Sequence, residues 1–175
     1  MNQWLSLLFI LIFAPAALAA EPNALQHFTP MQGKLTFTQT KHIQGLPVPL
    51  QSSGYIELEG EDLLWHTTKP LDSKLLINPA GVSQWQEQQF VAVGGSEFVG
   101  QLMLAVLKQQ DQFIAEHFAI SALSKEQCIT LTPTQAPLNT LFLHITLCGE
   151  HALQKIELQE VNENHTVIHL AKDTP

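Results

Sequence analysis

Short alternating strands joined by tight turns constrain the fold of this chain more than any other feature. Residues 55–59 place Tyr55, Glu57 and Glu59 on one side and Ile56 and Leu58 on the other, which is the period of a half-buried strand. The same signal predicts strands at 63–68, 74–78, 82–86 and 89–93, with turns at Gly60, 70–72, 79–81 and 87–88. This part of the chain is therefore predicted to be a meander of antiparallel strands.

The rest of the chain carries both strand and helix signals. A short helix is predicted within 22–30 and a strand at 33–43, whereas the Pro-rich stretch 44–54 is not expected to form a regular central strand. Apolar side chains at helical spacing predict a helix over 96–110, and a second helix is predicted at 111–117. Further strands are predicted at 118–123, 128–132, 141–147, 153–161 and 166–172, with Leu158 opposite Ile168 and Ile156 opposite Leu170.

A sheet of this length has to curl or fold over in order to bury one face. The helix over 96–110 is the element that closes the concave side. The result is a hollow interior lined with Leu, Ile, Val, Phe and Trp, where an apolar ligand would sit. The alternative is that this helix and the aromatic side chains simply fill an ordinary core.

The first twenty residues predict export. Leu5–Phe13 is apolar, Pro15 interrupts it, and Ala17-Leu18-Ala19 supplies small residues where a signal peptidase reads. We therefore expect a signal peptide over 1–19, cleaved after Ala19, and a soluble exported domain over 20–175. A retained membrane anchor is the competing interpretation, although the apolar core is short for a span of about 20 residues.

The charge balance excludes one large class of partner. Acidic residues outnumber basic ones 16 to 8, and every basic residue is a lysine. Nucleic-acid binding is not expected, because phosphate contacts depend on clustered Arg and Lys. The acidic surface suits either a positively charged partner or simple solubility.

Two cysteines in an exported chain predict one disulfide. Residues 128–148 resemble two strands around a Pro/Asn turn, and a register with Cys128 opposite Cys148 also pairs Ile129 with Leu147 and Leu131 with Ile145. Opposed residues of an antiparallel pair are close enough for a disulfide. Metal binding by the cysteines is not expected, because neither has a Cys or His neighbour at ligand spacing.

Catalytic motifs are missing from the sequence. The stretch Gly94-Gly95-Ser96-Glu97-Phe98 is not a nucleophile elbow and instead suits a helix entry. Of the 8 histidines, only His165 and His169 share a strand face, which is a weak metal-ligand signal. Carboxylates cluster at a solvent-facing turn, at Glu57, Glu59, Glu61 and Asp62. We therefore expect neither an enzyme nor a metal or other cofactor.

The order and spacing of several short motifs resemble a known family. They are Phe37–Gln39, Ser53-Gly54, Leu64-Trp65 followed by Lys69-Pro70, the strand run to Trp85, the helical stretch 100–118 and the ending 158–170. Together they cover nearly the whole chain after residue 20. The chain resembles the outer-membrane lipoprotein carrier protein (LolA) family, in particular its divergent LolA-like branch.

The resemblance implies a mainly β, α+β fold: an incomplete, strongly curved antiparallel barrel whose helices cover an apolar cavity. It also implies a monomeric periplasmic shuttle that takes acylated lipoproteins from an inner-membrane ABC transporter, or another donor, to an outer-membrane acceptor. The expected acyl-chain site consists of Leu35, Phe37, Ile56, Leu58, Leu63, Trp65, Leu75, Ile77, Trp85, Val91 and Val93, beneath a lid helix presenting Phe98, Val99, Leu102, Met103 and Val106.

One departure from the family leaves the cargo and the lid open. Typical members carry an arginine just after the second strand that holds the lid closed, but this stretch is Leu58-Glu59-Gly60-Glu61 and the chain has no arginine. Either another contact latches the lid or the lid opens differently. The cargo is then a lipoprotein or another lipid, such as an acylated or polyene glycolipid. A third interpretation is a non-carrying envelope interaction module with a filled cavity.

Overall fold

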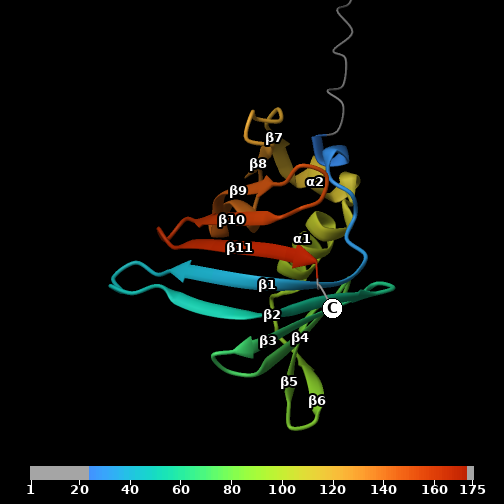
Figure 1. Ribbon diagram of the computed structural model, residues 1–175, viewed down its shortest axis with the longest axis vertical. Coiled ribbons are helices and arrows are strands. Elements are labelled where there is room, and N and C mark those ends of the chain that lie inside the picture. The colour runs from blue at the N-terminus through green and yellow to red at the C-terminus, as the bar shows by residue number, and fades with distance from the viewer. Residues whose placement is uncertain (1–23, 173–175) are drawn as a thin grey trace, which may run out of the picture.

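The computed structural model describes residues 24–172, whose strands form one antiparallel, 11-stranded sheet (Figure 1). The strands are β1 (Gly33–His42), β2 (Leu50–Glu59), β3 (Asp62–Lys69), β4 (Ser73–Asn78), β5 (Gly81–Gln86), β6 (Gln89–Ala92), β7 (Phe118–Ile120), β8 (Cys128–Pro133), β9 (Phe142–Cys148), β10 (Lys155–Glu160) and β11 (His165–Lys172). The helices are the 3₁₀ helix η1 (Ala24–His27), α1 (Glu97–Lys108), α2 (Asp111–His117) and α3 (Leu138–Leu141). The predicted signal peptide lies outside the described residues.

The sheet consists of two meanders that meet where the first described strand pairs with the last. Its order is β6-β5-β4-β3-β2-β1-β11-β10-β9-β8-β7, so β6 and β7 are the free edges and the sheet does not close. The chain passes from one edge to the other through α1 and α2, which lie on one side of the curved sheet (Figure 1). The predicted fold class, an open curved antiparallel barrel with helices, is confirmed.

Most predicted elements are present, and the differences have local causes. Strand β2 begins at Leu50 rather than at residue 55, because Pro47 and Pro49 precede the strand and residues 50–54 are free to pair with β1. Strand β7 ends at Ile120 instead of 123. The short helix α3 was not predicted.

The register of the last hairpin differs from the prediction by two residues. Ile156 lies opposite Ile168, and Leu158 lies opposite Thr166. Both registers keep the same side chains on the same face, so the apolar pattern cannot separate them. The turn decides, because the Glu160 amide donates to the Asn164 carbonyl at 2.9 Å.

Glycine at position 54 is required where β2 meets β3. The pairing of these strands shifts between Ser53 and Gly54, which marks a bulge. A Cβ on Gly54 would lie 1.9 Å from the carbonyl oxygen of His66. Because Gly54 has no side chain, the backbone of β2 can lie this close to His66 of β3.

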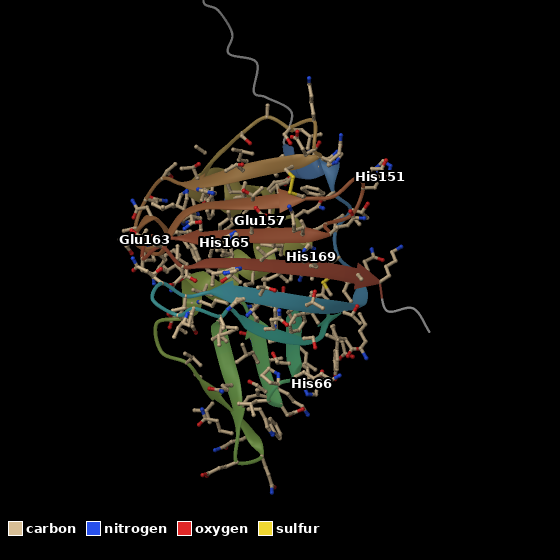
Figure 2. All side chains as sticks on the ribbon, turned by 60° about the vertical axis from the view of Figure 1, so that its left-hand side comes forward. His66, His151, Glu157, Glu163, His165 and His169 are labelled. Atoms are coloured by element: carbon tan, nitrogen blue, oxygen red, sulfur yellow. A yellow bond between two sulfur atoms is a disulfide. The ribbon has the colours of Figure 1, made fainter. Side chains whose placement is uncertain are left out.

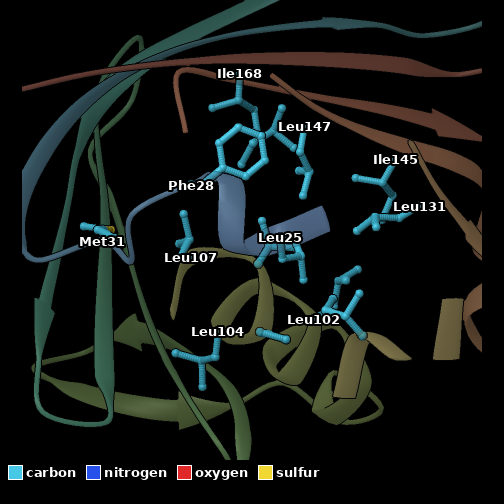
Figure 3. Packing of buried hydrophobic residues seen from close by; sticks show 14 of the residues in the cluster. Leu25, Phe28, Met31, Leu102, Leu104, Leu107, Leu131, Ile145, Leu147 and Ile168 are labelled. Carbon is cyan, nitrogen blue, oxygen red and sulfur yellow. The ribbon is translucent and has the colours of Figure 1, made fainter. Parts of the chain in front are cut away.

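The core fills the centre of the concave side. Leu25 and Phe28, from the N-terminal segment, lie between α1 and the strands of the second meander (Figure 3). Leu104 and Leu107 of α1 belong to the same buried cluster, and all four side chains are at most 3% exposed. The N-terminal segment is therefore an internal layer between helix and sheet.

Hydrogen bonds fix the start of α1 to the edge of the first meander. The Ser96 hydroxyl accepts from the Val82 amide at 3.0 Å and lies 2.5 Å from the Val93 carbonyl oxygen, to which it donates. Helix α1 ends at Lys108, and the next residue, Gln109, has a left-handed backbone that stops the helix. The amide of Gln110 then donates to the Ala105 carbonyl at 2.9 Å.

Candidate ligand-binding cavity

Two rows of directly opposed side chains cross the concave face of the first meander. One row runs through Leu35, Ile56, Trp65, Leu75, Gln84 and Val91. The other runs through Leu58, Leu63, Ile77 and Val82. Because directly opposed residues point to the same side, the register brings most of the predicted cavity residues together on one face.

These side chains differ in how completely the protein covers them. Phe37, Ile56, Leu63, Trp65 and Ile77 are buried in the core, and the rings of Phe37 and Trp65 lie 4.6 Å apart. Leu35, Leu58 and Leu75 are half-buried. Val91 and Val93, near the free edge, are 39% and 42% exposed. The apolar face therefore continues outward beyond the packed core.

Trp85 does not belong to this face. Val82 lies opposite Ile77 on the concave side, so strand alternation puts Trp85 on the convex side. There it lies opposite Phe90, with ring centroids 4.9 Å apart, and its side chain is 44% exposed. The prediction that Trp85 lines the cavity is wrong. Its neighbour Gln84 faces the concave side, and adjacent residues of a strand face opposite sides.

The predicted lid residues of α1 divide into two groups. Leu102 and Val106 are buried in the core, whereas Val99 and Met103 are partly buried. Phe98 is 37% exposed, and its ring lies 6.0 Å from that of His117. One side of α1 is thus part of the core, and its first turn leaves apolar surface open to solvent.

The centre of the expected hollow is occupied by the chain itself. Leu25 and Phe28 fill the space between α1 and the sheet, and Met31 follows them with its amide donating to the Leu107 carbonyl at 2.8 Å. The three-residue spacing of these apolar side chains is visible in the sequence and predicts one apolar side of a short helix. This spacing does not indicate that the segment lies between α1 and the concave face of the sheet.

A cavity of about 770 Å³ lies at the end of the concave face, where β1 begins and β11 ends. Two predicted site residues, Leu35 and Val106, line it. The complete lining is Thr29, Pro30, Met31, Gln32, Leu35, Val106, Leu107, Gln109, His151, Ala152, Leu153, Gln154, His169, Leu170, Ala171 and Lys172. Sequence reasoning missed most of these residues because they come from segments outside the first meander.

A lysine on α1 contacts the turn between β2 and β3. The Lys108 ammonium donates to the carbonyl of Gly60 at 3.0 Å, which ties the end of α1 to the turn between β2 and β3. The interaction is exposed, so its net stabilisation is small.

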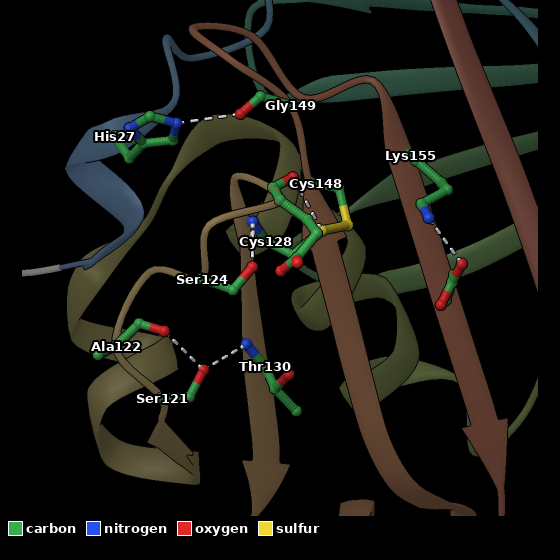
Figure 4. Close-up of a disulfide and its surroundings, with 11 residues drawn as sticks. His27, Ser121, Ala122, Ser124, Cys128, Thr130, Cys148, Gly149 and Lys155 are labelled. Carbon is green, nitrogen blue, oxygen red and sulfur yellow. Dashed lines mark hydrogen bonds and ion pairs between the residues drawn. A yellow bond between two sulfur atoms is a disulfide. The ribbon is translucent and has the colours of Figure 1, made fainter.

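The disulfide lies near the cavity, between two strands of the second meander. Cys128 and Cys148 are bonded in the predicted register, with Ile129 opposite Leu147 and Leu131 opposite Ile145 (Figure 4). The bond joins the start of β8 to the end of β9. The residue after Cys148 is Gly149, whose carbonyl lies 3.0 Å from His27 Nε2. The His151 carbonyl accepts from the Thr29 amide at 2.7 Å. The N-terminal segment is therefore held by a cross-linked part of the second meander.

The convex face carries a hydrogen-bonded chain that sequence reasoning missed. His66 joins the Tyr55 hydroxyl and the Asp72 carboxylate, each at 2.8 Å (Figure 2 shows His66). None of the three side chains lines the cavity described above. This chain ties the turn between β3 and β4 to β2.

Metal ligation finds no support among residues 24–172, where no group of three or more His, Cys, Asp or Glu side chains is placed to hold an ion. His165 lies against His42 instead, with ring centroids 6.1 Å apart. Among the described helices, none has the length and apolar character that crossing a bilayer requires.

Comparison with known proteins finds similarity in structure only. No protein-family model matches the chain, and no curated protein matches it. A LolA superfamily protein from Nitrosomonas europaea is 8% identical over 87% of this chain and 92% of that chain, with a TM-score of 0.46. LprF from Mycobacterium bovis is 12% identical over 85% and 90% of the two chains, with a TM-score of 0.39.

A third similar structure is the Pseudomonas aeruginosa MucA/MucB complex. The match is 11% identical, covers 86% of this chain and 52% of that chain, and has a TM-score of 0.44. At such identities and scores, these matches describe a general arrangement of the chain and carry no information on ligand or partner.

Proposed function

We propose that this protein is a periplasmic carrier that binds acyl chains of lipids or lipoproteins and moves them from the inner to the outer membrane. The observation that carries the proposal is the apolar concave face, which continues past its packed core into a cavity of about 770 Å³. Pockets that hold a small ligand have volumes of about 300–1,000 Å³. The cavity is therefore of a size to receive an acyl chain.

The predicted signal peptide and the disulfide support the periplasmic location in this proposal. Residues 1–19 have the pattern of a cleavable signal peptide, and structural disulfides such as Cys128–Cys148 persist in oxidising compartments. The carrier domain spans residues 20–175 and acts as a monomer without cofactor, metal or nucleic acid. It is not an enzyme.

A carrier must bind its cargo and release it. Each buried methylene contributes about 0.8 kcal/mol, so an acyl chain that covers half-buried Leu35, Leu58 and Leu75 gains affinity without unfolding the core. Phe98, Val99, Leu102, Met103 and Val106 of α1 form the cover in this proposal. The exposed Lys108–Gly60 hydrogen bond is the latch, and its small contribution allows release.

The donor is an inner-membrane ABC transporter or another inner-membrane protein, and the acceptor lies in the outer membrane. The cargo is the acylated part of a lipoprotein or an acylated or polyene glycolipid. The missing arginine favours neither cargo over the other.

One observation favours a second candidate function. Leu25 and Phe28 already occupy the centre of the concave side, at 0% and 3% exposure. A protein whose interior is filled by its own chain suits a non-carrying interaction module of the envelope.

Titration of residues 20–175 with a fluorescent fatty acid separates the two functions. We expect saturable binding that Leu35→Glu weakens about ten-fold or more, because the new carboxylate would have to be buried beside the chain. Thr38→Glu is the matched control, since Thr38 lies on the same strand with its side chain on the convex face. If the unaltered domain shows no binding, the carrier proposal fails and the interaction module is favoured.

A further inference from the structure

Residues 25–32 cross the interior between the second meander and α1. On the side of the sheet, the Thr29 amide donates to the His151 carbonyl at 2.7 Å. On the side of the helix, the Met31 amide donates to the Leu107 carbonyl at 2.8 Å. Because backbone hydrogen bonds hold it to both elements, the segment has a defined place between them.

The two halves of this segment have different surroundings. Leu25 and Phe28 are 0% and 3% exposed and belong to the buried cluster at the centre of the concave side (Figure 3). Residues 29–32 line the cavity. Met31 does both, since its side chain belongs to the buried cluster and also lines the cavity. Residues 25–32, the partition, therefore lie between the cavity and the centre of the molecule.

The space left beside the partition suits one ligand chain. The cavity has a volume of about 770 Å³, which is within the range of about 300–1,000 Å³ for one small ligand. Neither Leu25 nor Phe28 lines it, and the centre that they fill is packed as closely as other protein interiors. A second chain beside the first would therefore need the space that the partition occupies.

We propose that the partition limits this carrier to ligands with one acyl chain, such as a fatty acid or a lysophospholipid. The chain lies in the cavity against Met31, Leu35 and Leu107. To admit a second chain of the same ligand, the hydrogen bonds at Thr29 and Met31 would have to break. This inference rests on the proposed carrier function and narrows its cargo.

The test compares one chain with two chains on the same head group. Residues 20–175 carrying a fluorescent fatty acid are titrated with octanoyl lysophosphatidylcholine and with dioctanoyl phosphatidylcholine, both below their aggregation concentrations. We expect the two-chain lipid to bind no more than about ten-fold more tightly, because its second chain stays in water. A site with room for both chains would favour the two-chain lipid by about a hundred-fold or more, since each methylene that leaves water adds to the affinity.

Shortening Met31 opens the partition from the side of the cavity. Met31→Ala is expected to raise the affinity of the two-chain lipid relative to the one-chain lipid by about ten-fold, because it extends the cavity toward the centre. Leu138→Ala is the matched control, since Leu138 is 0% exposed and does not line the cavity, so the ratio should not change. Circular dichroism checks that both variants fold, and Met31→Val, which removes less volume, replaces a Met31→Ala domain that does not.

The outcomes separate the inference from the function on which it rests. A two-chain lipid that the unaltered domain binds more than about ten-fold more tightly overturns the role of the partition and leaves a carrier of larger lipids. A ratio that a folded Met31 variant leaves unchanged overturns it as well. Failure of both lipids and of the fluorescent fatty acid to bind overturns the carrier proposal, and this inference with it.

Discussion

Gly100 of α1 lies directly against the backbone of Gly81 in β5. A Cβ on Gly100 would be 3.0 Å from the carbonyl carbon of Gly81 and 3.1 Å from its Cα. At Gly100 the backbones of α1 and β5 therefore approach closely, and the Ser96 hydroxyl bonds to Val82 of β5 just before the helix. The other end of α1 borders the cavity, so the helix is fixed at one end and adjoins the site at the other.

Replacement of Gly100 by alanine tests this contact. We expect Gly100→Ala to lower the free energy of unfolding by about 1–3 kcal/mol through overpacking, although alanine favours a helix by about 1 kcal/mol over glycine. Urea denaturation measures the difference. Gly94→Ala is the control, because a Cβ there meets no atom within 4 Å. A Gly100→Ala domain as stable as the unaltered one would contradict the close contact.

Glutamate substitutions on α1 separate its core side from its exposed first turn. Leu102 is 5% exposed, so Leu102→Glu buries a charge and is expected to unfold the domain or to cost several kcal/mol. Phe98 is 37% exposed, so Phe98→Glu should leave the fold intact. It should weaken binding of an acyl ligand that extends from the cavity along the concave face to the first turn of α1. Circular dichroism and ligand titration measure the two effects. If Phe98→Glu folds and binds normally, the first turn of α1 takes no part in the site.

The disulfide is expected to contribute to stability. Cys128 and Cys148 are 20 residues apart in the sequence, and closing such a loop stabilises a protein by about 2–4 kcal/mol. The Cys128→Ser, Cys148→Ser double variant should therefore show a lower urea midpoint than the oxidised domain. Equal midpoints would mean that the cross-link adds nothing to the packing of β8 on β9.

The lowered pKa of Glu160 predicts how the stability of the protein changes with pH. Burial acts to raise the pKa of its carboxyl group, but hydrogen bonds from Lys41 and Asn164 and the charge of Lys41 outweigh it and hold the pKa below its ordinary value. A pKa lowered on folding stabilises the protein above the unfolded pKa, which is about 4.3 for Glu. That stabilisation is lost as the pH falls through the folded pKa.

We therefore expect Glu160→Gln to reduce stability at pH 7 and to reduce it much less at about pH 3, well below the unfolded pKa. Urea midpoints at the two values measure the effect. The same reduction at both values would show that the Lys41–Glu160 pair, 2.8 Å apart, does not set the acid stability.

The fold was predictable from the sequence because alternation fixes which face each strand buries. The pairing of Cys128 with Cys148 follows from one register that places the two cysteines opposite each other and also pairs apolar residues on the other face. Where two registers bury the same face, as for Ile156 and Leu158, the pattern is silent and the turn decides. Trp85 shows the converse, because its size suggested the interior while its position in the alternation placed it outside.

The cavity was much less predictable. Its lining joins Thr29 to Lys172 and Val106 to His151, residues that the long-range pairing of β1 with β11 and the insertion of the N-terminal segment bring together. No repeating pattern of apolar residues in the sequence indicates either arrangement. The apolar spacing of Leu25 and Phe28 predicted a buried side, but only tertiary packing places that side inside the sheet.

The most direct test is native mass spectrometry of the protein isolated from the periplasmic fraction without detergent, followed by solvent extraction. We expect a population heavier than the domain over residues 20–175 by the mass of one acyl-bearing molecule, and we expect that molecule in the extract. Mass of the bare polypeptide alone, with no fatty acyl compound in the extract and no uptake of added oleate, would contradict a carrier.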